Sequence, residues 1–439
     1  MPRAAMWPPC GELRLATSAS ALPLGGSVVN APAAAHPIRY HPLMATTTLS
    51  LPATAREPLW TRNYVLTLVS MHLFFLSWTM LFSTLPLYLE DAKKWQVGWI
   101  VGGAFGVSSL AVRIWSGRVV DRSGRRWSLV LGAAITGLAT AGFVLTDSPL
   151  LLTPVRLAYG VAACFYTTAG MAMLADVLPQ SRRGEGMGWY GVFYTTPNVY
   201  GPWLGLALAE NGSLPLSFLA GAAVLLACAA VSWFIDEDRE HFTPPAGAAL
   251  VSRSALLPTA GFVTLAIAFS TLPAFLVLFA KQRDLGNAGI FFLLLGLALV
   301  AARWCGGRAA DRFGRPAVIL PGFVLGAAGM ALLALAPNTP AFYASALVFG
   351  VGFALGHTGL TILTVDRAPP MERGTAMATF VLAWDFGTLG SFLLSFVADA
   401  INLRALFLAA ACLPLIAFVA FQLLWRRAPL RSGSGQDRA

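Results

Sequence analysis

Charged residues are scarce in this chain of 439 residues. Asp, Glu, Lys and Arg make up 11% of the sequence, whereas a soluble domain carries roughly 25% charged residues. Hydrophobic residues make up 57%. A chain of this composition cannot cover a water-facing surface, so most of its exterior must face lipid.

Several residue patterns that would indicate catalysis are missing. The sequence contains only three lysines, Lys93, Lys94 and Lys281, and none follows a glycine as a nucleotide-binding P-loop requires. The five cysteines form no CxxC pair or metal-type spacing, which argues against a disulfide framework and against zinc. The sequence also contains no HExxH or GxSxG motif. We therefore expect no ATP-driven pump and no enzyme, with no catalytic residue, metal or cofactor.

Long apolar runs dominate the rest of the sequence. Twelve of them approach or exceed the roughly 20 residues that a helix needs to cross a bilayer. The predicted spans are 63–89, 97–118, 127–146, 150–175, 186–209, 214–235, 256–280, 288–309, 317–336, 340–365, 374–398 and 403–425. The expected fold is therefore an all-α polytopic membrane protein with short connections and no inserted soluble domain.

Basic residues favour one set of loops, and short cytoplasmic loops retain Arg and Lys. The basic set comprises Arg118, Arg122, Arg125, Arg126, Arg182, Arg183, Arg308, Arg312, Arg315, Arg367 and Arg373, with Arg426 and Arg427 in the tail. The opposite loops hold Lys93, Lys94, Lys281, Arg283 and Arg404. We therefore expect both termini in the cytoplasm. This asymmetry accounts for the net charge of +10, which carries no inference of nucleic-acid binding.

The first segment differs from the rest. Residues 1–58 are rich in Ala, Pro, Ser and Thr and contain no 15-residue apolar core of the kind that a secretory signal has. We expect a disordered N-terminal extension. A start at Met44 and a transit peptide stay open as alternatives.

The sequence repeats itself. "AVRIWSGRVVDRSGRR" (111–126) and "AARWCGGRAADRFGRP" (301–316) match at an offset of 190 residues, and Asp176-x2-Pro179-x3-Arg183-Gly184 matches Asp366-x2-Pro369-x3-Arg373-Gly374 at the same offset. We predict two parallel six-helix repeats around a central cavity, an arrangement typical of one class of transporter. The expected parts are bundles at 59–235 and 256–425, a cytoplasmic linker at 236–255 and a cytoplasmic tail at 426–439.

The G-x3-D-R-x-G-R-R loop between the second and third spans resembles the signature loop of the major facilitator superfamily. Arg156-x3-Gly160 in the fourth span and "GPWLG" (201–205) in the fifth are similar to parts of that family's second and third motifs. The resemblance covers about 60–425. It implies alternating access between inward- and outward-open states, a lipid bilayer as environment and, for the third motif, antiport.

The resemblance also implies a cytoplasmic gate. Asp121 would meet the start of the eleventh span near Arg373, and Asp311 would meet the start of the fifth span near Arg183. The contacts would hold the cytoplasmic side shut, because a carboxylate stabilises the positive end of a helix dipole. The alternative is that the arginines only fix topology. The gate candidates are Gly117, Asp121, Arg122, Gly124, Arg125, Gly307, Asp311, Arg312, Gly314, Arg315, Arg183 and Arg373.

Charges at membrane depth are candidate functional residues because their burial is costly. Asp385 lies about 16 Å along the eleventh span at 1.5 Å per residue, where it could bind a proton, a cationic substrate or a structural partner within the second half. Arg156, His72 and His357 are candidates for proton coupling or substrate binding, with structural packing as the alternative. Arg113 and Arg303 are expected to reach toward lipid phosphates. The cavity candidates are Trp384, Tyr166, Tyr190, Tyr194 and Asn198.

These observations predict a secondary transporter of the bacterial inner membrane that works as a monomer. The leading hypothesis is efflux of a small, partly hydrophobic molecule in exchange for protons. Import of sugars or metabolites is the first alternative because fold does not fix direction. A membrane sensor or scaffold that has lost transport is the second.

Overall fold

Helices account for all regular secondary structure in the described residues, 58–237, 251–369 and 372–427 of the computed structural model. Each predicted span coincides with a helical stretch, and the second is divided by a π-helical segment, η1. The first group comprises α1 (Arg62–Tyr88), α2 (Lys94–Gly98), η1 (Trp99–Gly103), α3 (Ala104–Ser123), α4 (Arg125–Gly142), α5 (Pro149–Val177), α6 (Arg183–Asn211) and α7 (Leu214–Trp233). The second group comprises α8 (Leu256–Arg283), α9 (Ala288–Phe313), α10 (Pro316–Leu335), α11 (Thr339–Arg367), α12 (Arg373–Ala400) and α13 (Leu403–Arg427).

Eleven helical stretches in the described ranges are long and apolar enough to cross a membrane. The predicted fifth span is the exception. Helix α6 has 29 residues, which is sufficient length, but it is less apolar because it carries Pro197, Pro202 and several polar side chains. The all-α membrane class is confirmed.

Glycine explains the turn within each repeated motif. Gly124 separates α3 from α4 with a φ of 95°, and Gly314 separates α9 from α10 with a φ of 86°. Residues with a side chain rarely adopt such angles, so glycine allows two antiparallel helices to follow one another almost without a loop.

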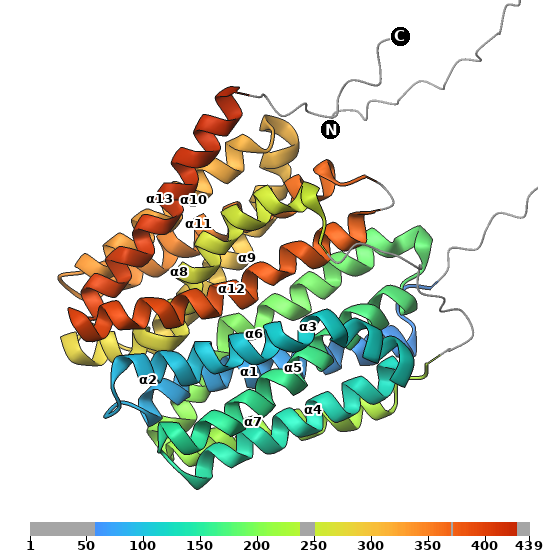
Figure 1. Cartoon of the computed structure of the whole chain (residues 1–439), viewed down its shortest axis with the longest axis horizontal. Helices are drawn as coiled ribbons and strands as arrows, with labels where there is room; N and C mark the ends of the chain where they lie inside the picture. The colour runs from blue at the N-terminus through green and yellow to red at the C-terminus, as the bar shows by residue number, and fades with distance from the viewer. Residues whose placement is uncertain (1–57, 238–250, 370–371, 428–439) are drawn as a thin grey trace, which may run out of the picture. The chain divides into compact units, whose positions relative to one another are not determined.

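The helices form two groups that pack along each other. Figure 1 shows α1–α7, in blue to green, beside α8–α13, in yellow to red. Contacts between the groups follow a two-fold pattern: α2, η1 and α3 pack on α12, while α9 packs on α6. Residues from Ala55 onward belong to one compact unit, so the proposed bundle boundaries stay a prediction. The N-terminal extension, most of the linker and most of the tail lie outside the described residues.

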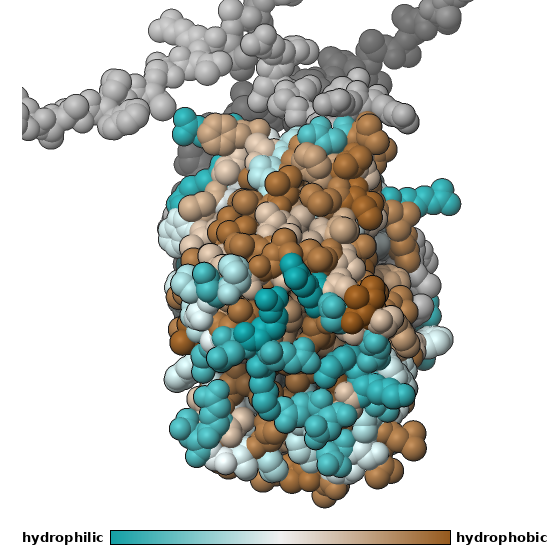
Figure 2. All heavy atoms as spheres, turned by 90° about the vertical axis from the view of Figure 1, so that its left-hand side faces the viewer, coloured by the Kyte–Doolittle hydropathy of each residue, from teal (hydrophilic) through white to brown (hydrophobic). Residues whose placement is uncertain are grey.

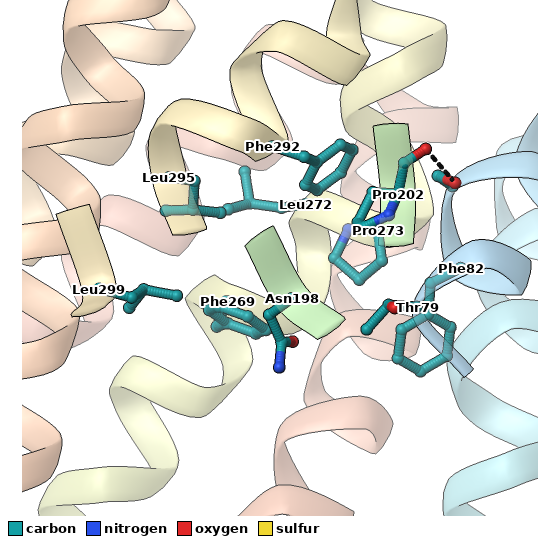
Figure 3. Close-up of a pocket in the computed structure, with 11 residues that line it drawn as sticks. Thr79, Phe82, Asn198, Pro202, Phe269, Leu272, Pro273, Phe292, Leu295 and Leu299 are labelled. Atoms are coloured by element: carbon teal, nitrogen blue, oxygen red, sulfur yellow. Dashed lines mark hydrogen bonds between the residues drawn. The ribbon is translucent and has the colours of Figure 1, made fainter. Parts of the chain in front are cut away.

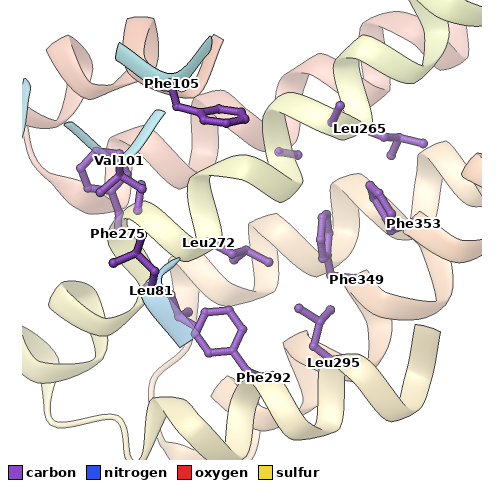
Figure 4. Close-up of a cluster of buried hydrophobic side chains, with 14 of the residues drawn as sticks. Leu81, Val101, Phe105, Leu265, Leu272, Phe275, Phe292, Leu295, Phe349 and Phe353 are labelled. Carbon is purple, nitrogen blue, oxygen red and sulfur yellow. The ribbon is translucent and has the colours of Figure 1, made fainter. Parts of the chain in front are cut away.

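Buried apolar side chains from both groups form a continuous core. Figure 4 shows Leu81, Val101 and Phe105 near residues of the second group such as Leu272 and Phe275. Lipid tails are as apolar as these side chains, so the hydrophobic effect does not drive the helices together within the membrane. Close packing must supply the stabilisation. Glycines make such packing close where α10 crosses α11, since a Cβ on Gly352 would lie 2.2 Å from the backbone nitrogen of Gly326.

We predict that Gly352→Val separates α10 from α11 and lowers stability by about 1–3 kcal/mol or more, the usual effect of overpacking. Thermal unfolding of the purified protein would show a lower midpoint. Gly374→Ala is the matched control, because no atom lies within 4 Å of the added methyl group. Equal midpoints for the two variants would contradict this account.

Candidate functional site

A buried ion pair joins the two groups of helices. Nε of Arg113 on α3 lies 2.5 Å from Oδ2 of Asp385 on α12, and Nη2 donates a hydrogen bond to Oδ1 at 3.0 Å. The Ser109 hydroxyl donates to the same Oδ1 at 2.8 Å. The Asp385 side chain is 2% exposed, so its charge depends on this partner. The expectation that Arg113 reaches lipid phosphates is wrong.

The second repeat places an arginine at the equivalent position. Arg303 follows Arg113 by 190 residues, and Asp385 follows Thr195 by 190 residues. Nη1 of Arg303 on α9 donates to the Thr195 hydroxyl on α6 at 2.9 Å. Each half thus sends one arginine to the same place in the other half, but it meets a carboxylate in one case and a hydroxyl in the other. Arg303 therefore does not reach toward lipid phosphates either.

The two ends of the membrane-spanning unit differ in how closely the groups approach. We name the ends the Arg end, which carries Asp121 and Asp311, and the Lys end, which carries Lys94 and Lys281. On the Lys side of Arg113, a Cβ on Gly102 would lie 2.7 Å from the Thr388 carbonyl oxygen on α12. On the Lys side of Arg303, a Cβ on Gly296 would lie 2.4 Å from Cα of Val199 on α6. The Lys end is therefore closed.

The Arg end is open. Gly117 and Gly307 lie one turn beyond Arg113 and Arg303 on the same helix faces, since residues four apart share a face. No atom lies within 4 Å of a Cβ built at either glycine. Helices α3 and α9 therefore diverge from the opposite group toward the Arg end.

Polar contacts between the groups reinforce the closed Lys end. The Asp399 carboxylate on α12 accepts hydrogen bonds from the backbone N–H groups of Lys94 at 2.8 Å and Trp95 at 2.7 Å, at the start of α2. Lys281 forms an ion pair with Glu90. Figure 2 views this end and shows its hydrophilic side chains gathered together, with hydrophobic ones around them.

A small cavity lies between the groups on the Lys side of Arg303. Residues of α1, α6, α8 and α9 line it, among them Thr79, Asn198, Phe269 and Leu299, and Figure 3 shows their side chains converging. Its volume is about 30 Å³, whereas ligand pockets span roughly 300–1,000 Å³. The cavity has room for little more than ordered water in this conformation.

The repeated motif loops make ion pairs within their own halves. Arg125 pairs with Asp176 at the end of α5, and the equivalent Arg315 pairs with Asp366 at the end of α11, at 2.8 Å. Hydrogen bonds to Asp366 raise the pKa of Arg315 above its ordinary value. The pairs tie the α3–α4 and α9–α10 turns to the neighbouring helix.

The two predicted gate contacts would form only when the Arg end is closed, and this end is open in the structure. Asp121 interacts electrostatically with Arg125, one turn away, and Arg373 is exposed. Asp311 pairs with Arg315 at 2.9 Å. The Arg183 side chain is outside the described residues. Both gate contacts, and the roles of the remaining gate residues Gly117, Arg122, Gly124, Gly307, Arg312 and Gly314, stay predictions.

Arg156 supports the π-helical segment. Its side chain is fully buried, with Nε donating to the Ile100 carbonyl and Nη2 to the Val101 carbonyl, both at 2.9 Å. Its guanidinium lies 4.5 Å from the ring centroid of Tyr159. These contacts support a structural role for Arg156. A π-helix interrupts the regular α-helical hydrogen bonds, and Arg156 supplies donors to two carbonyl groups of this segment.

The two histidines have different neighbours. Nδ1 of His72 lies 3.0 Å from the Phe193 carbonyl oxygen and Nε2 lies 2.6 Å from the Tyr200 hydroxyl, so α6 holds its ring at both nitrogens. Nδ1 of His357 lies 3.5 Å from Nη2 of Arg303. His357 therefore belongs with Arg303 between the groups, whereas His72 belongs to the first group.

The cavity candidates separate into three sets. Tyr166 stacks on Phe74 at 3.9 Å and its hydroxyl lies 2.6 Å from the Ser70 hydroxyl, so it is a core residue in this conformation, contrary to expectation. Trp384 packs against aromatic rings of α8 and α11. The remaining candidates are Tyr190 and Tyr194, which lie near Arg303, and Asn198, which lines the cavity between the groups.

Comparison with known proteins agrees with this arrangement. The family model of the Major Facilitator Superfamily matches residues 67–387 and again 288–439. The chain belongs to this superfamily.

Relatives of this Major Facilitator Superfamily chain cover most of its length. It is 27% identical to an uncharacterised MFS-type transporter of Salmonella typhimurium over 78% of the chain and 91% of the relative. It is 23% identical to the staphylopine export protein of Staphylococcus aureus, over 82% and 94%. A crystal structure of a bacterial homologue of the human lysosomal transporter Spinster superposes with a TM-score of 0.73 at 15% identity, over 87% and 100%.

Sequence reasoning missed the partners of the two central arginines in this superfamily member. The sequence shows that Arg113 and Arg303 are repeated and predicts that Asp385 lies at membrane depth. The 190-residue offset aligns Asp385 with Thr195, but nothing in the sequence places either residue beside an arginine.

We predict that Arg156→Met destabilises the protein, because the Ile100 and Val101 carbonyls lose their donors. An unsatisfied buried acceptor costs about 1–3 kcal/mol. The thermal midpoint should fall by several degrees, and Arg156→Lys should recover part of the loss by serving one carbonyl. An unchanged midpoint in Arg156→Met would instead favour a coupling role for Arg156.

We predict that Asp399→Ala loosens the Lys end. Both hydrogen bonds are exposed to water, so we expect a net loss near the lower value for a single hydrogen bond to a charged group, about 1.5 kcal/mol, which would open this end about tenfold more often. The measurement is the rate at which an impermeant maleimide labels Thr388→Cys from the Lys side, in a chain whose native cysteines are replaced. Asp147→Ala, at an exposed residue of the same end, is the control. An unaltered labelling rate would show that helix packing alone closes this end.

Proposed function

We propose that this protein exports a small molecule in exchange for protons by alternating access, with Asp385 as the proton-binding group. The observation that carries the proposal is the Arg113–Asp385 ion pair, buried between the two halves at membrane depth. Intramembrane carboxylates of this kind mark proton pathways.

The ion pair gives the proton a means of changing the contact between α3 and α12. While Asp385 is ionised, its two oxygens hold Arg113 through two nitrogen atoms. A proton on Asp385 removes the opposite charge, so Arg113 loses the partner that offsets its burial. Proton binding and release would therefore favour different arrangements of the two helices.

The described conformation fits one stage of such a cycle. The basic loops indicate that the Arg end faces the cytoplasm of a bacterial inner membrane, so the protein is open to the inside. Its ion pair is formed, which corresponds to a proton already released. A substrate could then enter from the cytoplasm, and a proton from outside would follow once the Lys end opened. The name of the staphylopine export protein supports the outward direction. A single chain contains both halves, so we propose a monomer.

We predict that Asp385→Asn strongly impairs exchange and also lowers stability, because Arg113 loses the charge that offsets its burial. Inside-out vesicles with an acidic lumen would be challenged with ethidium, 4-phenylbutyrate or glucose, and a pH-sensitive dye would report proton release. Release by wild-type vesicles on addition of one compound should fall about tenfold or more in the variant, an effect of about 1.4 kcal/mol or more. The double variant Asp385→Asn/Arg113→Gln removes both charges and should fold well while remaining uncoupled.

Asp91→Asn is the control for these vesicles, because Asp91 is an exposed carboxylate on the loop after α1. Compound-triggered release that persists in Asp385→Asn would contradict the assigned role of Asp385. Uptake of a compound by right-side-out vesicles, driven by an inward proton gradient, would contradict the export direction.

A further inference from the structure

We infer that Arg303 and Thr195 form a binding site for the carboxylate group of an amphipathic organic substrate. The inference deepens the proposed function, since it names a substrate class for the same central site. It depends on the comparison of the two repeats.

Arg113 shows how a carboxylate fits an arginine at this position. Asp385 occupies its Nε and Nη2 atoms. At Arg303, Thr195 supplies one hydroxyl to Nη1 instead. Neither Nε of Arg113 nor Nε of Arg303 makes a hydrogen bond within the described residues. Nε of Arg113 nevertheless lies 2.5 Å from the Asp385 carboxylate, whereas no described carboxylate forms an ion pair with the buried Nε of Arg303. The edge of the guanidinium that binds a carboxylate in the first repeat is therefore unoccupied in the second.

The surroundings of Arg303 contain polar groups but no counter-ion within the described ranges. Tyr190 and Tyr194 lie near it, and His357 contacts Nη2 at 3.5 Å. The tyrosine hydroxyls can donate hydrogen bonds to an anion beside the guanidinium. A partly buried guanidinium without a carboxylate is costly to maintain, so a ligand that supplies one is bound preferentially.

The apolar part of the ligand has a place one turn away. Leu299 precedes Arg303 by four residues on the same face of α9 and lines the central cavity with Phe269 and Phe292. Gly307 follows by four residues and faces open space. A ligand arriving from the Arg end would place its carboxylate at Arg303 and direct its apolar group toward the cavity, which enlarges as α6 and α9 separate.

The test compares 4-phenylbutyrate with its uncharged amide, which has the same shape without the negative charge. Binding to the purified full chain is measured by titration calorimetry at neutral pH with no proton gradient. We expect wild-type protein to bind the carboxylate about tenfold or more tightly than the amide. Arg303→Gln should lose this preference. Thr195→Asp should lose it too, because the new carboxylate would occupy Arg303 as Asp385 occupies Arg113.

Arg308→Gln is the matched control, since Arg308 is exposed on the same helix and lies over Trp304. It should bind as wild type does. Equal affinity of wild-type protein for acid and amide would overturn the inference, as would a preference that survives in Arg303→Gln or Thr195→Asp. If Arg303→Gln does not fold, Thr195→Asp still tests the inference, because the new carboxylate pairs with Arg303 and so preserves its stability.

This experiment is independent of proton coupling. Carboxylate selectivity together with unimpaired exchange in Asp385→Asn would refute the proposed function and leave the binding site standing. If exchange depends on Asp385 but acid and amide bind equally well, the proposed function stands and the binding site at Arg303 is refuted.

Discussion

The burial of charge between the two halves governs the rest of this structure. Arg113 and Asp385 are tolerated at membrane depth because each neutralises the other, and Ser109 donates a further hydrogen bond to Oδ1. Removing one partner of such a pair costs about 3–5 kcal/mol, whereas neutralising the carboxylate with a proton changes the balance reversibly. In the proposed cycle, proton binding at Asp385 would therefore bias how α3 and α12 approach each other.

The duplicated architecture directs attention to the residues that differ between its halves. Arg125–Asp176 and Arg315–Asp366 are equivalent ion pairs, and each holds one motif turn to its own half. The central contacts involve equivalent positions of the two repeats, but Asp385 is replaced by Thr195 in the other repeat. Arg156 has no counterpart either, since Ala346 lies at its equivalent position. We expect the repeated residues to maintain the fold and the differing ones to set the function.

The spans and the motif turns could be predicted because they depend on local sequence. Hydropathy and length locate the helices within a few residues, and the motif glycines mark turns at positive φ. The partners of Arg113 and Tyr166 could not be predicted, because hydropathy does not indicate which face of a membrane helix meets another helix. The sequence also does not predict which conformation the structure adopts, because the same helices can close at either end.

Membrane potential connects the asymmetry of the two arginines to the direction of transport. With Asp385 ionised, Arg113 is neutralised and Arg303 contributes one uncompensated positive charge, which suits a substrate with one negative charge. Moving one charge across 100 mV changes the free energy by about 2.3 kcal/mol. In a cell that is negative inside, this energy favours the exit of an anion and opposes its entry. A carboxylate site at Arg303 is therefore easier to reconcile with export than with uptake.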